Sequence, residues 1–328
     1  MGSVSRAVLE EVIYPWGDTR RYNSYAGYFR RLFGRRMQKL SVDAGFTCPN
    51  RDGTLGTRGC TFCNNAAFTP SYCSTGRTIR EQIDEGIAFH ARRYREAQRY
   101  LVYFQSFSNT YAPLEVLRAR YEEALSHPLV EGLVIGTRPD CVDRAKLDYL
   151  ASLSRERYVA VEYGIESVWD QTLERIGRGH DYATAVRAVE ESAARGLHVG
   201  AHFILGLPGE GAEEQLAAVE QINRLPLTTI KFHQLQLFRG TAMAEEYDLH
   251  PERFSFPSVE EYLDRVVEIL RRLRPDLVLE RFASEAPPRF HHGPNWGLIR
   301  NEQLWSMLEA KLKARNAYQG ELYREFKI

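Results

Sequence analysis

Cysteine is scarce in this chain, and neither sign of charge is in excess. The 328 residues contain five cysteines, and 43 basic residues balance 43 acidic ones. A small, odd number of cysteines argues against a disulfide framework and for a reducing compartment. A net charge of zero provides no global field that would attract nucleic acid. These features exclude a small disulfide-rich secreted protein and a uniformly basic one.

The sequence also lacks any apolar run long enough to span a membrane. Its first residues, MGSVSRAVLEE, have no apolar segment of the kind found in a signal peptide. Hydrophobic residues make up 44% of the chain and charged residues 26%, which is the composition of an ordinary globular protein. We therefore expect a cytoplasmic protein with no membrane partner.

Three of the five cysteines lie in one stretch, GFTCPNRDGTLGTRGCTFC. Cys60 and Cys63 form a C-x-x-C pair, and Cys48 precedes them with the overall spacing C-x11-C-x2-C. Glycines between Cys48 and Cys60 allow the loop to turn back and bring three thiolates together. Thiolates at this spacing favour a soft metal, either zinc or an iron–sulfur cluster.

A fourth protein ligand is missing from this set. A closed structural site uses four ligands, but the sequence has no second C-x-x-C and no C-x-x-H, and Cys73 and Cys141 are isolated. Three thiolates around a four-iron cluster leave one iron open for chemistry. Two alternatives remain: a structural zinc completed by Cys73 or a histidine, and three cysteines without any metal.

The cysteine loop resembles the cluster loop of radical S-adenosylmethionine (SAM) enzymes, although their usual spacing is the shorter C-x3-C-x2-C. The run GFTCPNRDGTLGTRGCTFCNNAAFTP resembles the YhcC-type radical SAM family and is related in spacing to the catalytic subunit of Elongator. The resemblance extends from about Arg21 to about Tyr323. It implies two cofactors, SAM and one 4Fe-4S cluster held by Cys48, Cys60 and Cys63.

Six apolar segments typical of strands alternate with segments of helical periodicity, which predicts a parallel sheet covered by helices. No G-x-G-x-x-G follows the first strand, which disfavours a dinucleotide fold. The expected fold is α/β, an incomplete (β/α)6 TIM-like barrel of the radical SAM type. We expect an N-terminal basic and aromatic extension at 1–36, the barrel at 37–275, and a C-terminal extension at 276–328 that packs on it. The predicted strands are 38–44, 101–105, 132–137, 158–166, 197–206 and 228–238.

In such a barrel the active site forms at the carboxyl ends of the strands. The run TRPD at 137–140 resembles an Elongator motif. The run Arg178-Gly179-His180 resembles the R-x-H of oxygen-independent coproporphyrinogen oxidase, where the arginine approaches the SAM carboxylate. Purely structural alternatives stay open, such as a salt bridge from Arg138 to Asp140 or a helix cap by Arg178. The sequence also departs from the wider superfamily, because no G-G-E motif follows the second strand. The resemblance implies SAM contacts from Phe62, Gln105, Ser108, Asn109, Arg138, Glu162, Glu166, Ser167, Arg178, Gly206, Leu207 and Pro208.

Candidates for substrate contact or catalysis lie in the fifth and sixth predicted strands, namely His202, Lys231 and His233. A lone histidine in a strand is more often a packed core residue, and alternation does not tell which face of these strands is inward.

Residues 20–39 contain seven basic residues and no acidic one, with aromatic residues interleaved. Arginine neutralises phosphate and aromatic rings stack on bases, so this segment is the best candidate for RNA binding. The alternative is a helix with a solvated basic face and a buried aromatic face. The candidate RNA contacts are Arg20, Arg21, Arg30, Arg31, Arg35 and Arg36.

The resemblance also implies a reaction. MnmL-like members of the YhcC-type family act on the wobble uridine of tRNA, where they convert a 5-carboxymethylaminomethyl group to 5-aminomethyl. We therefore expect a radical SAM enzyme with tRNA as substrate and a flavodoxin or ferredoxin as electron donor. One alternative is an enzyme for a small-molecule or peptide substrate. Another is a zinc-stabilised RNA-binding protein without catalysis.

Overall fold

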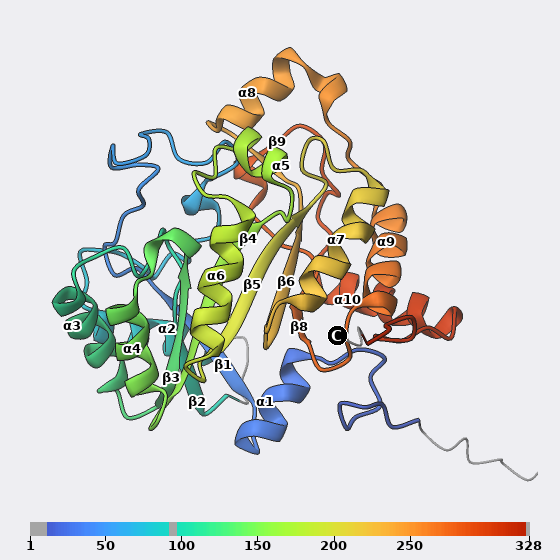
Figure 1. Cartoon of the computed structure of the whole chain (residues 1–328). Coiled ribbons are helices and arrows are strands. Elements are labelled where there is room, and N and C mark those ends of the chain that lie inside the picture. Colours follow the sequence, from blue (N-terminus) through green and yellow to red (C-terminus); the bar gives the residue numbers. More distant parts are fainter. Residues whose placement is uncertain (1–11, 92–96, 326–328) are drawn as a thin grey trace, which may run out of the picture.

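The computed structural model describes residues 12–91 and 97–325, and within them one curled sheet organises the chain (Figure 1). Its seven strands are all parallel and follow the order β1-β2-β3-β4-β5-β6-β8. The strands are β1 Met37–Val42, β2 Arg99–Phe104, β3 Val130–Thr137, β4 Tyr158–Glu166, β5 His198–Leu205, β6 Thr229–Gln234 and β8 Val278–Arg281.

Helices cover the outer face of this sheet and leave its concave face as a lumen (Figure 1). The covering helices are α2 Ile79–Ala91, α3 Leu114–Leu125, α4 Arg144–Leu153, α6 Tyr182–Ala193, α7 Ala212–Arg224 and α9 Val259–Arg272. Further elements are α1 Tyr25–Phe33, α5 Asp170–Arg175, α8 Ala242–Leu249, α10 Asn301–Ala314, β7 Leu237–Phe238 and β9 His291–His292. Short 3-10 turns occur at Asn65–Ala67, Pro139–Cys141, Pro251–Arg253 and Pro288–Phe290.

The alternation of side chains along β4 explains which residues face the lumen. Val159, Val161 and Tyr163 are fully buried in the main core between the sheet and the outer helices. Because successive strand residues point to opposite faces, the residues between them face the lumen. Glu162 is one of these, and a buried carboxylate requires partners.

Helix α1 closes the lumen at the amino ends of the strands. Phe29 is buried against Tyr158, with ring centroids 5.4 Å apart, and packs in one cluster with Leu101 and Val134. The Ser24 side chain caps the helix by accepting a hydrogen bond from the amide of Gly27 at 3.1 Å. The lumen is therefore plugged at the amino ends of the strands, and the pocket described below lies toward their carboxyl ends.

The predicted α/β half-barrel is confirmed, with one strand more than the six expected. The additional strand, β8, pairs in parallel with β6 and lies beyond the boundary predicted at residue 275. The short helix α5 was also not predicted. The periodicity of Ile79, Ile83 and Ile87 predicts a helix at 78–98; of this range, Ile79–Ala91 is helical, residues 97 and 98 are not, and 92–96 lie outside the described residues.

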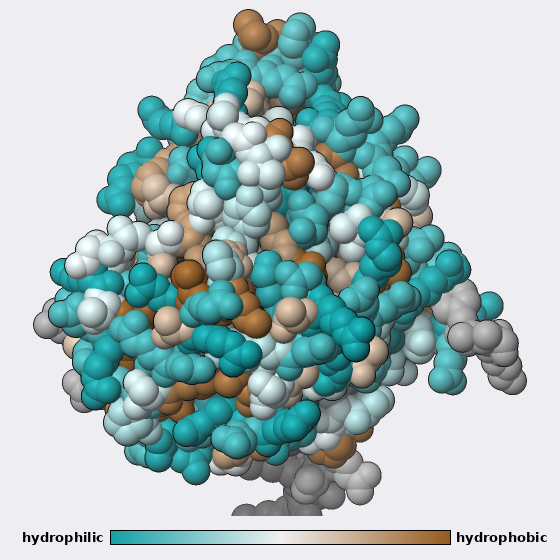
Figure 2. Space-filling view, turned by 60° about the vertical axis from the view of Figure 1, so that its left-hand side comes forward, coloured by the Kyte–Doolittle hydropathy of each residue, from teal (hydrophilic) through white to brown (hydrophobic). Residues whose placement is uncertain are grey.

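The segments on either side of the barrel run along the edge strand β8. The amide of Leu279 donates to the carbonyl of Asn23 at 2.8 Å, so the chain before α1 continues the sheet. Gln319 donates to the carbonyl of Leu277 at 2.8 Å. The face turned forward in Figure 2 is mostly hydrophilic, with apolar residues in small separate groups. Within the described residues, no helix has both the length and the apolar character needed to cross a membrane.

Candidate functional site

The three clustered cysteines line one pocket at the carboxyl ends of the strands. Cys48, Cys60 and Cys63 all border this cavity of about 240 Å³. Backbone hydrogen bonds fold the loop between them, including one from the amide of Gly59 to the carbonyl of Asn50 at 2.8 Å. Gly59 has φ +79°, and a Cβ there would lie 2.9 Å from the guanidinium of Arg51. This turn therefore requires glycine.

Hydrogen-bond donors surround the thiol of Cys60. The Nη1 of Arg178 lies 3.5 Å from its Sγ, and the Nδ2 of Asn50 lies 3.3 Å from it. Burial is the main cause that raises the pKa of the Cys63 thiol, and the neighbouring Cys60 raises it further. A cysteine that binds a metal must lose its proton. The resulting thiolate is stable in such a pocket only when a cation or a metal lies beside it.

The two remaining cysteines do not line this pocket. Cys73 donates through its Sγ to the carbonyl of Ser41 at 3.1 Å, and burial raises its pKa to about 12. Burial also raises the pKa of Cys141 to about 12. A structural zinc site would need a fourth ligand, and Cys73 is too far from the other three cysteines' pocket to line it.

The cysteines suit a cluster better than a single metal ion. Across residues 12–91 and 97–325, no three His, Cys, Asp or Glu side chains converge closely enough to hold one metal ion. A cluster binds each cysteine through a different iron, so its ligands are spread around a larger group. The donor set of three soft thiols around one cavity fits a 4Fe-4S cluster with one open iron.

Arg138 joins the same pocket from the end of β3. Its Nε and Nη2 each donate to Asp140 at 2.8 Å, so this part of the guanidinium forms the salt bridge that was the structural alternative. The remaining Nη1 is buried and has no hydrogen-bond partner in the part of the chain that the structure describes. A buried donor without a partner destabilises the fold, so an acceptor atom of a ligand in the pocket would be bound favourably by this Nη1.

Glu166 and Arg178 form a second charged pair at the end of β4. Glu166 has φ +74°, an unusual conformation for a residue with a side chain, and burial raises its pKa. Its Oε1 lies 3.7 Å from the Nη2 of Arg178. A Cβ at Gly164 would lie 2.5 Å from the Glu166 carboxylate. Strained backbone of this kind is concentrated at functional sites.

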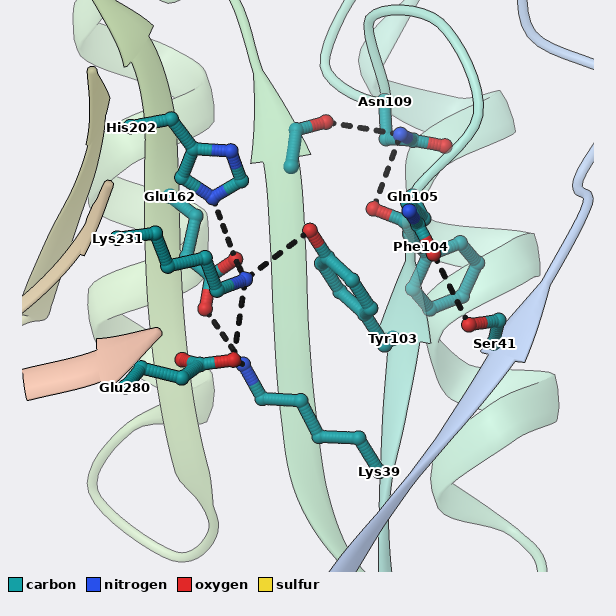
Figure 3. Close-up of polar contacts among 11 residues, drawn as sticks. Lys39, Ser41, Tyr103, Phe104, Gln105, Asn109, Glu162, His202, Lys231 and Glu280 are labelled. Carbon is teal, nitrogen blue, oxygen red and sulfur yellow. Dashed lines mark hydrogen bonds and ion pairs between the residues drawn. The ribbon is translucent and has the colours of Figure 1, made fainter. Parts of the chain in front are cut away.

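The structure brings seven of the twelve predicted SAM contacts to the pocket and leaves five away from it. The five do not line the cavity, and two of them, Asn109 and Ser167, make hydrogen bonds elsewhere. Asn109, for example, donates through Nδ2 to the carbonyls of Phe104 and Gly136, at 3.1 and 2.8 Å, and so ties β2 to β3 (Figure 3). Ser167 donates to Glu210. The lining residues are Phe62, Gln105, Ser108, Arg138, Glu162, Glu166 and Arg178, and the others are Asn109, Ser167, Gly206, Leu207 and Pro208.

A group of four charged residues, which we call the lumen ion cluster, lies in the inner part of the barrel (Figure 3). Lys39 from β1 donates to Glu162 at 2.6 Å and to Glu280 from β8 at 2.8 Å. Lys231 from β6 donates to Glu162 at 2.5 Å and lies 3.1 Å from Glu280. Glu162 is therefore paired with two lysines, and it also lines the pocket, so its contact with SAM stays a prediction.

The two candidate histidines lie beside the lumen ion cluster and are uncharged at neutral pH. His202 shares a hydrogen bond of 3.0 Å with Glu162 (Figure 3). Burial is the main cause that lowers the pKa of His202 to about 4, and the positive charge of Lys231 also lowers it. Burial lowers the pKa of His233 well below its usual value. Both rings line the pocket, as does Lys231. The three predicted substrate contacts are thus brought together.

Sequence analysis missed four residues of this inner site. Tyr103 accepts a hydrogen bond from Lys231 at 3.3 Å, and Lys39 and Glu280 complete the lumen ion cluster. Arg281 lines the pocket next to them. The available signal was a charged residue inside an otherwise apolar strand, as in QKLSV and LVLERF.

The basic and aromatic segment lies at the opposite end of the barrel from the cysteines (Figure 1). Tyr22 is buried and stacks on Trp305 with centroids 5.1 Å apart, and Phe29 is buried in the plug of the lumen. The expectation that these two rings stack on bases is therefore wrong, because protein side chains cover them. Arg30 and Arg35 are exposed. Four further arginines make contacts within the protein, namely Arg20, Arg21, Arg31 and Arg36.

Comparisons with known proteins agree with this geometry. A family model of the radical SAM superfamily matches residues 53–222, and one of the radical SAM C-terminal domain matches residues 227–314. Protein YhcC of Escherichia coli is 38% identical over 84% of this chain and 87% of its own length. A tRNA uridine(34) acetyltransferase of Methanocaldococcus infernus is 26% identical over 48% of this chain and 29% of its own.

Among solved structures, the archaeal Elp3 of Methanocaldococcus infernus superposes with a TM-score of 0.64. The match covers 86% of this chain and 64% of that chain at 14% identity, so it supports the fold alone. The identity with YhcC over most of both chains, together with the family match, decides the relationship. The chain belongs to the radical SAM superfamily and, within it, to the YhcC-type family.

Proposed function

We propose that this protein is a radical SAM enzyme that converts a 5-carboxymethylaminomethyl group on the wobble uridine of tRNA to 5-aminomethyl. The observation that carries the first part is the pocket itself. Three cysteines without a fourth line a cavity that α1 closes at its far end. Such a site holds a cluster with one open iron and limits the access of water to a reactive substrate.

Cys48, Cys60 and Cys63 would hold the cluster, and the guanidinium of Arg178 would act beside it. When bound, the cluster and SAM supply a 5′-deoxyadenosyl radical that removes a hydrogen atom from the substrate. A flavodoxin or ferredoxin would provide the electron. Arg178 already lies 3.5 Å from Cys60 and would bind the carboxylate of SAM by a charge-assisted hydrogen bond.

Other residues of the pocket orient the ligand. Asp140 holds Arg138 in place and leaves the buried Nη1 available for an acceptor. The hydroxyl of Ser108 also lines the pocket, is buried, and has no partner of good hydrogen-bond geometry among the described residues. Fixed donors of this kind bind a ligand at little entropic cost, because their side chains are already ordered.

A distant relative favours tRNA as the substrate. The Methanocaldococcus infernus relative is named for an activity on uridine 34 of tRNA. The substrate therefore rests on kinship, and the exposed arginines Arg30 and Arg35 offer phosphate contacts outside the pocket.

The test uses anaerobically reconstituted protein, SAM, dithionite and tRNA carrying 5-carboxymethylaminomethyluridine. The expected product after nucleoside digestion is 5-aminomethyluridine, and Cys60→Ala should form none. Formation of 5′-deoxyadenosine without any conversion of the tRNA would instead favour a small-molecule or peptide substrate. Colourless protein that contains zinc and cleaves no SAM would favour the non-catalytic RNA-binding alternative, because an iron–sulfur protein is brown.

A further inference from the structure

Arg281 is a cation without a partner in the inner part of the pocket. It is the last residue of β8, lines the cavity and is opposite Lys231 in the pairing of β6 with β8. Its guanidinium makes no ion pair or hydrogen bond with any residue that the structure describes. The neighbouring glutamate, Glu280, is already taken by Lys39 and Lys231.

The charges of the inner site do not balance without a ligand. Two lysines face two glutamates in the lumen ion cluster, and this pairing is complete. His202 and His233 add no positive charge because burial keeps them neutral. Arg281 therefore leaves one positive charge in excess. A cation in a half-buried cavity is best stabilised by an anion that enters with the ligand.

The surroundings of Arg281 are suited to one small planar anion. His233 lines the same part of the pocket and makes no hydrogen bond with the described residues. An arginine presents two parallel N–H groups that match a carboxylate. A free imidazole beside it supplies a further polar contact.

We propose that Arg281, with His233 beside it, forms a subsite for a carboxylate carried by the substrate, so that the enzyme selects a substrate that is anionic at the reacting group. The proposal rests on the proposed function and deepens it. The carboxylate would be that of the carboxymethyl group, whereas the aminomethyl product lacks a carboxylate and would be released more readily. Arg281 is thus a specificity residue that touches the substrate.

The carboxylate of SAM is the competing source of this anion. Two arginines at the cysteine end of the pocket are placed for SAM, since Arg178 lies 3.5 Å from Cys60 and Arg138 has a free buried Nη1. Arg281 belongs to the other group of residues, with Lys231 and Glu280. The two sources are separated by measuring the affinity for SAM in the same variant.

The experiment measures binding of two anticodon stem-loop RNAs to anaerobically reconstituted protein. One RNA carries 5-carboxymethylaminomethyluridine at the wobble position and the other carries the methyl ester of the same group. The two RNAs share every phosphate, so the ratio of their dissociation constants reports the carboxylate alone. We expect the wild-type protein to prefer the acid by about tenfold, the effect of one charge-assisted contact.

Arg281→Gln should bring this ratio close to one and leave the affinity for SAM unchanged. Arg281→Lys keeps the charge without the paired donors and should give an intermediate ratio, which serves if the glutamine variant does not fold. Arg155→Gln removes an exposed charge at the amino ends of the strands and should keep the wild-type ratio. The proposal is overturned if the wild type shows no preference, if Arg281→Gln retains it, or if that variant loses affinity for SAM instead.

Failure of the subsite and failure of the proposed function give different results. Conversion of the tRNA by wild-type protein without any preference for the acid would overturn the subsite and keep the reaction. A clear preference for the acid without conversion would support the subsite and overturn the reaction.

Discussion

The guanidinium of Arg178 joins the cysteine loop to the end of β4, since its Nη1 lies 3.5 Å from the Sγ of Cys60 and its Nη2 lies 3.7 Å from Glu166. One side chain thus contacts a candidate cluster ligand and a carboxylate with a raised pKa. A further hydrogen bond of 3.2 Å from its Nε to the carbonyl of Gly164 fixes its position. This geometry makes Arg178 the best candidate for the SAM carboxylate.

Arg178→Met should weaken the binding of SAM by roughly 10- to 100-fold, because a hydrogen bond to a charged group contributes about 1.5–3 kcal/mol. Arg178→Lys should lose less affinity for SAM than Arg178→Met, since lysine keeps the positive charge. The measurement is equilibrium binding of SAM to reconstituted protein of equal iron content. An unchanged affinity in Arg178→Met would show that the carboxylate is bound elsewhere.

Glu162→Gln should destabilise the fold by about 3–5 kcal/mol, because it leaves two buried lysines with less compensating charge. Glu162 is only 2% exposed and pairs with both Lys39 and Lys231. The measurement is the free energy of unfolding in urea. Adding Lys231→Met should recover part of the loss, because it removes one uncompensated cation.

Glu220→Gln is the matched control for this prediction. Its partner is Arg224 on the same helix, and the two side chains are 52% and 54% exposed. An exposed pair of this kind contributes about 0.5 kcal/mol or less. Equal losses in the two glutamate variants would contradict a buried ion cluster.

The sequence predicted the elements whose signal is local. The predicted and observed limits of β4 agree, because its nine residues are mostly apolar or aromatic and are bounded by polar turns. The strand β8 has only four residues, and no helical segment of the usual pattern follows it, so its short apolar run did not identify it as part of the sheet. The cysteine site was predictable because the spacing of its ligands is itself local.

The lumen ion cluster could not be predicted from the sequence. Lys39 and Glu280 are 241 positions apart, and they meet only because the sheet curls until β1 and β8 face each other. Their pairing follows from this closure. The same closure explains why Glu162, predicted as a SAM contact, is also paired with two lysines. A charged residue within an apolar strand indicates that a partner exists, but it does not identify the partner.

Lowering the pH from 7.5 to 5 should destabilise the protein, and His202 should account for about 2 kcal/mol of the loss. Burial lowers the pKa of His202 to about 4 in the folded state, whereas an unfolded histidine titrates near 6.5. Below pH 6.5 the unfolded chain therefore binds more protons than the folded one. The stability is complete above this pH and is lost as the pH falls towards 4.

Urea unfolding at several pH values tests this prediction. His202→Gln cannot titrate, so its loss of stability between pH 7.5 and 5 should be smaller than that of the wild type by about 2 kcal/mol. His250 is 45% exposed, and His250→Gln is the control. An identical pH profile for the wild type and His202→Gln would show that His202 is not held neutral.

Arg30→Ala combined with Arg35→Ala should weaken tRNA binding without affecting the fold. Both side chains are exposed, whereas the rings of Tyr22 and Phe29 are used in packing. Each phosphate contact that is lost should reduce the slope of log K against log salt by about 0.9 on duplex regions. The measurement is tRNA affinity at several salt concentrations. An unchanged slope would mean that these arginines form only a solvated face.

The most direct test of the account is made on the cysteines. Wild-type protein is reconstituted anaerobically, its iron and visible spectrum are measured, and 5′-deoxyadenosine is determined after SAM and dithionite are added, beside Cys60→Ala and Cys73→Ala. We predict a brown wild-type protein that forms 5′-deoxyadenosine, a colourless and inactive Cys60→Ala, and a Cys73→Ala that resembles the wild type, because Cys73 does not line the pocket. Activity in Cys60→Ala, or a wild type that binds zinc and cleaves no SAM, would contradict the account.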